Sequence, residues 1–229
     1  MSHASSLARR NATVALFVIS AATAALALAV GSLHAKSVST STTAVSSIEP
    51  SNAWLGKLKG KHRQFFDNPS PNGGIALVHV MYYYDTYNKA FGVKDVDVKA
   101  VLTFYGATTF YALNDAVWAK YKLGEFLDTT DPATGKPATA NPWRSAPVIL
   151  GMTLPSASIE SLSSRGATLI LCNNALSIFA GLLAQKRGLA TNVVYEDLKA
   201  NILPGIDLVP GMVIAVEQAQ RAGLSYHRQ

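Results

Sequence analysis

From Gly73 to Gln229, the chain alternates short apolar runs with segments of helical periodicity. We expect strands over 75–83, 96–105, 148–152, 167–171, 206–209 and 224–228. We expect helices between them over 85–91, 109–126, 155–164, 173–186, 195–200 and 212–222. Strands separated by helices favour a mainly parallel sheet with right-handed crossovers and helices on both faces. The predicted fold class is therefore α/β, with one layered domain over 73–229 that is large enough for a sizeable core.

The run over 75–83 decides where the predicted sheet begins. It is apolar from Ile75 to Tyr83 and is interrupted only by His79. A half-exposed strand would alternate apolar and polar residues, so the continuous run predicts a strand covered on both faces. His79 is then expected to be a core residue. A short helix over 85–91 should follow, and Gly92 should end it.

Residues 1–35 have the features of an export signal or of an N-terminal membrane anchor. Arg9 and Arg10 precede an apolar stretch over 12–30, and Ala35 offers a small residue for cleavage. The stretch is long for a signal peptide and matches the roughly 20 residues that a spanning helix needs. Cleavage and anchoring both stay open, as do the twin-arginine and general secretion routes. Either alternative places the domain outside the cytoplasm, in the periplasm.

Residues 36–72 are expected to form a Ser/Thr-rich linker and a basic arm. The arm is either solvated or attracted to anionic lipid or an acidic partner, and its basic residues are Lys57, Lys59, Lys61, His62 and Arg63. From residue 73 onward, 13 Lys and Arg face 12 Asp and Glu, so the net charge of +6 belongs mainly to the N-terminal parts. A nucleic-acid-binding domain would concentrate positive charge on its folded surface, so we exclude nucleic acid as a partner. Membrane contact is expected only through an uncleaved N-terminal segment.

Cys172 is the only cysteine, and it stands between the strand predicted over 167–171 and the helix predicted over 173–186. A thiol at a helix N-terminus feels the positive end of the helix dipole, which favours the thiolate. Backbone N–H groups at Asn173 and Asn174 would stabilise that anion, although Asn173 could instead be the helix N-cap. The alternative is a buried cysteine that only fills space. An intramolecular disulfide is excluded, although an exported protein meets an oxidising compartment.

Other candidate ligand-binding residues follow two further predicted strands. Tyr82 and Asp85, in the tyrosine-rich segment 82–87, would form a pocket wall with a polar handle, or else pack under loops or at an oligomer interface. Thr108 lies in a turn of small residues, where it would contact a ligand or cap a helix. Arg144 ends an irregular loop over 128–147 and would either hold an anion or remain a surface residue. No spacing of ligands predicts a metal site, and no glycine-rich turn predicts a cofactor.

The region from about Gly73 to Arg228 resembles the DsrE/DsrF-like family of small α/β proteins of sulfur metabolism, and the resemblance is most specific in the C-terminal third. The features that carry the resemblance are Leu169-Ile-Leu-Cys172, Arg187-Gly188, the segment 203–210, Gln218 or Gln220, Gly223 and Tyr226. The resemblance implies a flavodoxin-type layered fold that assembles into homo-oligomers. Some members of the family relay persulfide sulfur on a cysteine that matches Cys172, and others lack that chemistry, so the resemblance implies persulfide carriage as one role for Cys172. This chain departs from the family's cytoplasmic sulfur relays by its predicted export signal and by the loop over 128–147.

Two functions follow as hypotheses. The first is an exported persulfide carrier or sulfurtransferase that uses Cys172 and exchanges sulfur with a donor or acceptor protein. The second is a non-enzymatic periplasmic module that binds a ligand through its tyrosines or assembles with other copies, with Cys172 in the core. The helix predicted over 173–186 carries apolar residues on more than one side, which favours an oligomer.

Overall fold

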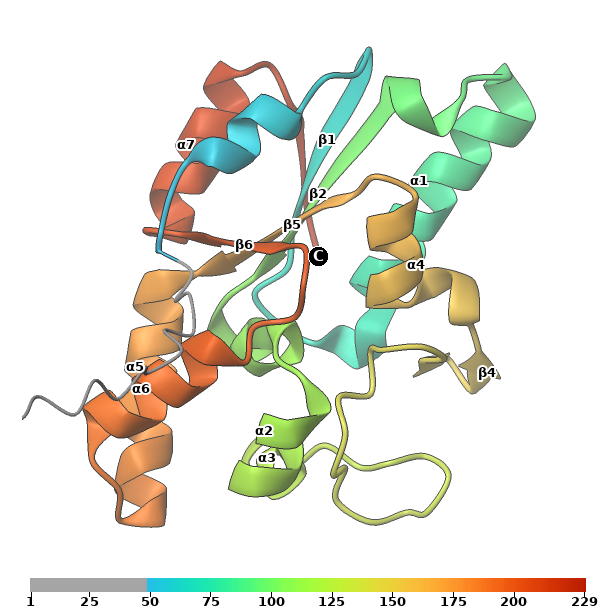
Figure 1. Ribbon diagram of the computed structural model, residues 1–229. Coiled ribbons are helices and arrows are strands. Elements are labelled where there is room, and N and C mark those ends of the chain that lie inside the picture. Colours follow the sequence, from blue (N-terminus) through green and yellow to red (C-terminus); the bar gives the residue numbers. More distant parts are fainter. Residues whose placement is uncertain (1–48) are drawn as a thin grey trace, which may run out of the picture. The chain divides into compact units, whose positions relative to one another are not determined.

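The computed structural model describes residues 49–229 (Figure 1). The predicted export signal over 1–35 and most of the predicted linker lie outside the described residues. Within 49–229, no helix is long and apolar enough to cross a membrane.

The described residues form a five-stranded sheet in which every neighbouring pair of strands is parallel. The strand order is β6-β5-β2-β1-β7. The strands are β1 (His62–Asp67), β2 (Val98–Phe104), β5 (Thr168–Cys172), β6 (Ile206–Val209) and β7 (Ser225–Arg228). Helices cover both faces of this sheet, so the predicted α/β class is confirmed.

The sheet divides the core into two parts, and helices cover the part on each face. On one side of the sheet lie α7 and the 3-10 helix η1, and on the other lie α1 and α4 (Figure 1). The helices are η1 (Ala53–Lys57), α1 (Ile75–Phe91), η4 (Gly106–Ala112), α2 (Asp115–Tyr121), α3 (Leu123–Leu127), α4 (Ile159–Ser164), α5 (Asn173–Arg187), α6 (Thr191–Ala200) and α7 (Met212–Arg221). Two short 3-10 helices, η2 (Asn72–Gly74) and η3 (Asp95–Asp97), flank α1, and a third, η5 (Pro155–Ala157), precedes α4.

The prediction of a strand over 75–83 is wrong, because the run forms the first half of α1. Its buried residues recur at helical spacing and are Ala76, Leu77, Val78, Val80, Met81 and Tyr84. Tyr82 and Tyr83 extend the apolar run because they line an aromatic groove on another side of this helix. A continuous apolar run fits a buried strand and a buried helix equally well.

The domain also begins before Gly73, because His62–Asp67 forms β1 between β2 and β7. The burial pattern explains why a basic arm is expected there. His62, Arg63 and Gln64 are only partly buried, whereas Phe65, Phe66 and Asp67 are fully buried. Upstream of this strand, Trp54 of η1 is completely buried against the α7 face. Because the first half of β1 is polar and basic, the sequence pattern does not indicate a strand, although the second half is buried.

The other elements are close to the predictions. The strands β5 and β6 and the helices α5 and α7 form as expected. The helix predicted over 109–126 is divided into η4, α2 and α3, with Lys122 in a left-handed conformation at φ 50°. The segment over 128–147 is irregular, as expected, and a two-stranded antiparallel sheet of β3 (Val148–Ile149) and β4 (Met152–Thr153) follows it.

The strand order creates a topological switch point between β1 and β7. From β1 the chain proceeds through β2 and β5 to β6 and then returns by α7 to place β7 on the other side of β1. In open α/β sheets, ligands bind outside the carboxyl ends of the strands at such a point. The strand order therefore predicts a ligand site near the residues that follow β1 and β7.

Candidate functional site

Cys172 lies where the sequence places it, at the carboxyl end of an inner strand. It is the last residue of β5 and the N-cap of α5. Its Sγ accepts hydrogen bonds from the backbone N–H groups of Ala175 (3.4 Å) and Met212 (3.3 Å). The N-termini of α5 and α7 therefore both donate to one sulfur atom. Only 5% of the residue is exposed, so a reagent has little access to it.

The two asparagines after Cys172 do not have the expected roles. Cys172 itself caps α5, so Asn173 is not the N-cap. The Asn173 Oδ1 accepts a hydrogen bond from the Tyr195 hydroxyl at 2.6 Å, which ties α5 to α6. Asn174 is exposed, and its side-chain amide lies next to Gly211. The amides that donate to Sγ come from Ala175 and Met212 instead.

Tyr82 lines a groove, but the groove lies along α1 and not at a strand end. We call it the tyrosine groove. It has a volume of about 430 Å³ and is lined by Gln64, Phe66, His79, Tyr82, Tyr83, Thr86, Tyr87, Phe91 and His227. One wall is α1, and the other comes from β1 and the edge strand β7. Tyr82 therefore lies in the wall of a groove, although the segment that carries it is a helix and not the predicted strand.

The polar groups of the tyrosine groove include two imidazoles that lie against each other. His79 and His227 stack with their ring centroids 5.4 Å apart, and the His79 Nδ1 contacts the Gln229 Oε1. Burial, and then the neighbouring Tyr87 and Tyr84, raise the pKa of Tyr83, so its hydroxyl stays protonated at neutral pH. The groove therefore combines aromatic walls with neutral hydroxyl groups and two imidazoles.

Asp85 does not serve this groove as a polar handle. Its carboxylate pairs with Arg165 at 2.7 Å and with Lys89 at 3.1 Å. Burial alone would raise the pKa of Asp85, but the hydrogen bonds from Arg165 and Lys89 outweigh it and lower the pKa. Arg165 also binds Asp95 at 2.9 Å. Asp85 therefore holds α1 to the segment after α4.

Thr108 is a capping residue. It is completely buried, and its hydroxyl donates to the carbonyl of Asn68 at 2.7 Å. The same oxygen accepts from the backbone N–H of Tyr105 at 3.1 Å, which closes a capping box at the start of η4. The turn before it needs a glycine, because Gly106 has φ 58° and approaches the Pro69 carbonyl oxygen closely. The turn is thus packed and leaves Thr108 no surface for a ligand.

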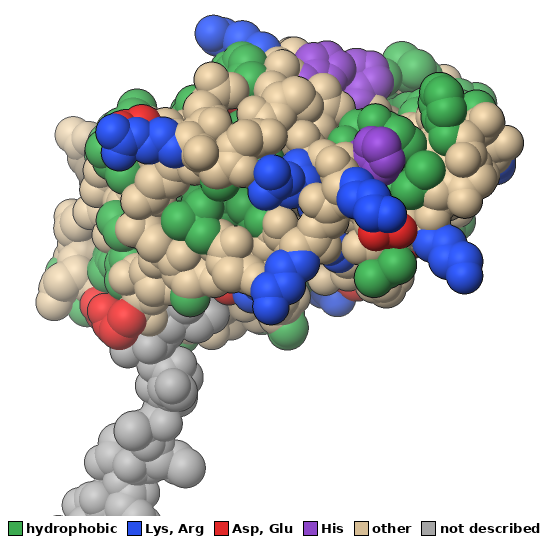
Figure 2. Space-filling model, turned by 90° about the horizontal axis from the view of Figure 1, so that it is seen from above, with side chains coloured by type: hydrophobic (Ala, Val, Ile, Leu, Met, Phe, Trp, Pro, Cys, Tyr) green, Lys and Arg blue, Asp and Glu red, His purple; other side chains and the backbone are tan. Residues whose placement is uncertain are grey.

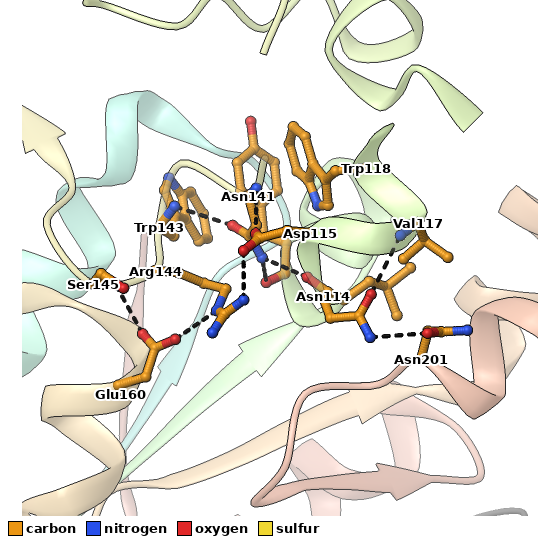
Figure 3. Close-up of polar contacts among 12 residues, drawn as sticks. Asn114, Asp115, Val117, Trp118, Asn141, Trp143, Arg144, Ser145, Glu160 and Asn201 are labelled. Atoms are coloured by element: carbon orange, nitrogen blue, oxygen red, sulfur yellow. Dashed lines mark hydrogen bonds and ion pairs between the residues drawn. The ribbon is translucent and has the colours of Figure 1, made fainter. Parts of the chain in front are cut away.

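Arg144 holds the long loop in place, because two carboxylates pair with its guanidinium (Figure 3). Its Nη1 donates to Asp115 at 2.7 Å and its Nε donates to Glu160 at 2.6 Å. The Ser145 backbone N–H donates to the second oxygen of Glu160. Two carboxylates neutralise the guanidinium, so the arrangement does not favour an anion at this position.

Asn141 and Trp143 anchor the same loop to the core. The Asn141 side-chain amide donates to the carbonyls of Tyr111 and Leu113 at 2.7 and 2.8 Å. Trp143 is 4% exposed and stacks on Tyr111 with ring centroids 4.0 Å apart. A cavity of about 550 Å³ borders this loop. Asn141, Trp143 and Arg144 therefore attach the loop over 128–147 to the rest of the domain.

A polar cluster at the switch point was not predicted from the sequence. Asp67, the last residue of β1, is 4% exposed and accepts a hydrogen bond from the Tyr226 hydroxyl, while its Oδ1 has no partner among the described residues. Asn68 is completely buried, and its side chain has no described partner either. The available signal is the apolar pair Phe65–Phe66 that ends in a polar turn at Asn68–Pro69.

Two tyrosines surround the Asp67 carboxylate. Burial, and then the hydrogen bond to Asp67, raise the pKa values of Tyr105 and Tyr226. Tyr105 follows β2 next to the strand that ends in Cys172, since Phe104 pairs with Leu171. Cys172, Tyr105 and Asp67 therefore mark the carboxyl ends of three adjacent strands, and Cys172 is the one nearest β6.

Within residues 49–229, no group of three or more His, Cys, Asp or Glu side chains is arranged to hold a metal ion. The sequence as a whole matches no known protein-family model, and no similar sequence is found among curated proteins.

Proposed function

We propose that this protein is a binding module whose tyrosine groove holds a small ligand with an aromatic or otherwise planar apolar body. The observation that carries the proposal is the lining of the groove. Its walls are mostly aromatic rings, and only a few polar groups converge on it. Small-molecule sites have this composition, and their volumes range from about 300 to 1,000 Å³.

The position of the polar groups suggests how such a ligand would be oriented. The stacked imidazoles of His79 and His227 come from α1 and β7, one from each wall of the groove, and Gln64 and Thr86 add one amide and one hydroxyl. A planar body would stack against Tyr83 and Tyr87, which are partly exposed. A hydrogen-bonding substituent would then meet the imidazole pair. The ligand class is therefore an aromatic compound with one polar substituent.

A thermal-shift screen with aromatic acids, phenols, indoles and their saturated analogues tests this proposal. We expect aromatic members to raise the melting temperature, because a ligand that binds only the folded state stabilises it by mass action. Tyr82 is 56% exposed, so Tyr82→Ala should preserve the fold while weakening the affinity about tenfold. Val213→Ala on α7 is the control, since Val213 is 78% exposed and lies outside the groove. Equal affinity in both variants, or stabilisation by none of the compounds, would reject the proposal.

A second function, sulfur transfer by Cys172, is favoured by the two backbone N–H groups that donate to Sγ. These donors would stabilise a thiolate. The thiolate would attack the outer sulfur of a donor persulfide, form a new S–S bond, and release the donor as its thiolate. The product would be a persulfide on Cys172. The resemblance to the DsrE/DsrF-like family stays a prediction and supports the same chemistry.

Intact mass and labelling kinetics separate this second function from the first. A sulfur carrier should gain one sulfur atom from a sulfane-sulfur donor, and Cys172→Ser should gain none. The burial of Cys172 predicts instead that a thiol reagent labels the folded protein far more slowly than the protein in denaturant. Slow labelling of folded protein, together with no gain of sulfur, would leave the binding module as the remaining proposal.

A further inference from the structure

The amino end of the sheet carries a group of cations that the folded body does not neutralise. Five basic side chains at this end form no ion pair with another described residue: Lys59, Lys61, Arg63, Lys94 and Lys99. They come from the turn before β1, the start of β1, the turn before β2 and the start of β2. The expected basic arm is thus folded into one surface, which we call the basic face.

Contacts between the turns show that these residues share one end of the molecule. The Lys61 backbone N–H donates to the Asp97 carbonyl at 2.9 Å, which joins the turns before β1 and β2. The Lys99 side chain lies beside Gly60 and Gly166, and the Arg63 guanidinium lies beside Gly223. Figure 2 views this end from above and shows Lys and Arg side chains spread over it with few Asp or Glu side chains.

Exposed apolar residues lie among these cations. Phe91 ends α1 and is 69% exposed, and Val96 in η3 is 68% exposed. Lys94 stands between them in the sequence, and Lys99 follows. Cations that surround exposed apolar side chains are typical of surfaces that lie in the headgroup region of an anionic membrane.

We propose that the basic face docks on an anionic lipid bilayer, with Phe91 and Val96 entering the headgroup region. The cations are spread over several turns and do not converge on one pocket, so they fit the diffuse charge of a lipid surface better than a single bound anion. One of the two alternatives for the apolar segment over 12–30, an uncleaved anchor, would hold the domain beside a bilayer.

A tryptophan reporter at residue 96 tests the proposal in the full chain. Val96→Trp is mixed with vesicles of brominated lipid that are either zwitterionic or partly anionic, and tryptophan quenching is measured. The native Trp54, Trp118 and Trp143 are buried, so they should contribute little. We expect quenching only with anionic vesicles, and we expect about 0.5 M salt to remove it by screening. Quenching reports the position of residue 96, so attachment through the N-terminal segment alone would not produce it.

Matched variants make the outcome decisive. Val213→Trp places the reporter at an equally exposed position on α7 and should not be quenched. In the Val96→Trp background, Lys59→Gln with Lys61→Gln should weaken partitioning about fivefold for each charge removed. Lys122→Gln with Lys136→Gln, outside the basic face, should leave it unchanged. Equal quenching of the two reporters would overturn the proposal. Displacement of the vesicles by polyglutamate at matched charge would also overturn it, because that result would assign the basic face to an acidic protein.

Discussion

At the scale of single residues, Arg165 binds side chains from several elements at once. Its guanidinium binds Asp85 and Asp95, donates to the Asn88 side chain, and lies 4.8 Å from the ring centre of Tyr84. It is 19% exposed. Burial would raise the pKa of Asp95, but hydrogen bonds from Arg165 and Asn88 outweigh it and lower the pKa. For Asp85, hydrogen bonds from Arg165 and Lys89 have the same effect. One cation therefore couples α1, the turn before β2 and the segment after α4.

Replacement of Arg165 by Met should destabilise the protein by about 1–3 kcal/mol at pH 7, because two partly buried carboxylates would lose their partner. Since the folded pKa values of both carboxylates lie below those of the unfolded chain, their contribution is present above about pH 4 and is lost as the pH falls through the folded values. Urea unfolding at pH 7 and near pH 3 measures the difference, which should shrink at the lower pH. Arg221→Met, which removes an exposed helix pair, should cost less than about 0.5 kcal/mol at both pH values. A loss for Arg165→Met that does not vary with pH would contradict the assignment.

At the scale of elements, the success of a prediction depended on how many structures its pattern allows. The strand β5 and the helix α5 could be predicted because an apolar run of strand length passes into a segment of helical periodicity at Cys172. The helix α1 could not, because its apolar residues extend beyond the core-facing side to the tyrosine groove. The strand β1 could not either, because His62, Arg63 and Gln64 occupy its less buried half.

The same limit applies to the residues of the candidate site. The position of Cys172 could be predicted because it follows from local sequence pattern alone. Tyr82 lies in a groove wall, although the segment that carries it is a helix and not the predicted strand. The cluster of Asp67 and Asn68 depends on β1 and on its pairing with β7, which joins residues about 160 positions apart. Arg144 looked free in the sequence because its two carboxylate partners, Asp115 and Glu160, are brought to it only by tertiary packing.

At the scale of the whole molecule, the structure separates three surfaces. The switch point lies at the carboxyl ends of the strands, the basic face at their amino ends, and a third surface on the outer side of α5 and α6. This third surface exposes four large apolar side chains: Ile178 (63%), Leu182 (48%), Leu189 (48%) and Val193 (59%). Ile178 and Leu182 lie one turn apart on α5, which packs against α6. Apolar residues that are contiguous on a surface mark an interaction site more often than scattered ones.

We expect this α5–α6 surface to pair with the same surface of a second copy, because homo-oligomers most often form through self-complementary patches. Changing Ile178 and Leu182 together to Ser should shift the protein to the monomer, while helix content is kept because both side chains already face solvent. Light scattering coupled to size-exclusion chromatography over a range of concentrations measures the mass. The matched control is Val213→Ser with Ile214→Ser on α7, which removes exposed apolar side chains elsewhere and should leave the mass unchanged. A monomeric parent protein would refute the expectation. An oligomer that only the α7 variant dissolves would also refute it, since that result would move the interface to α7.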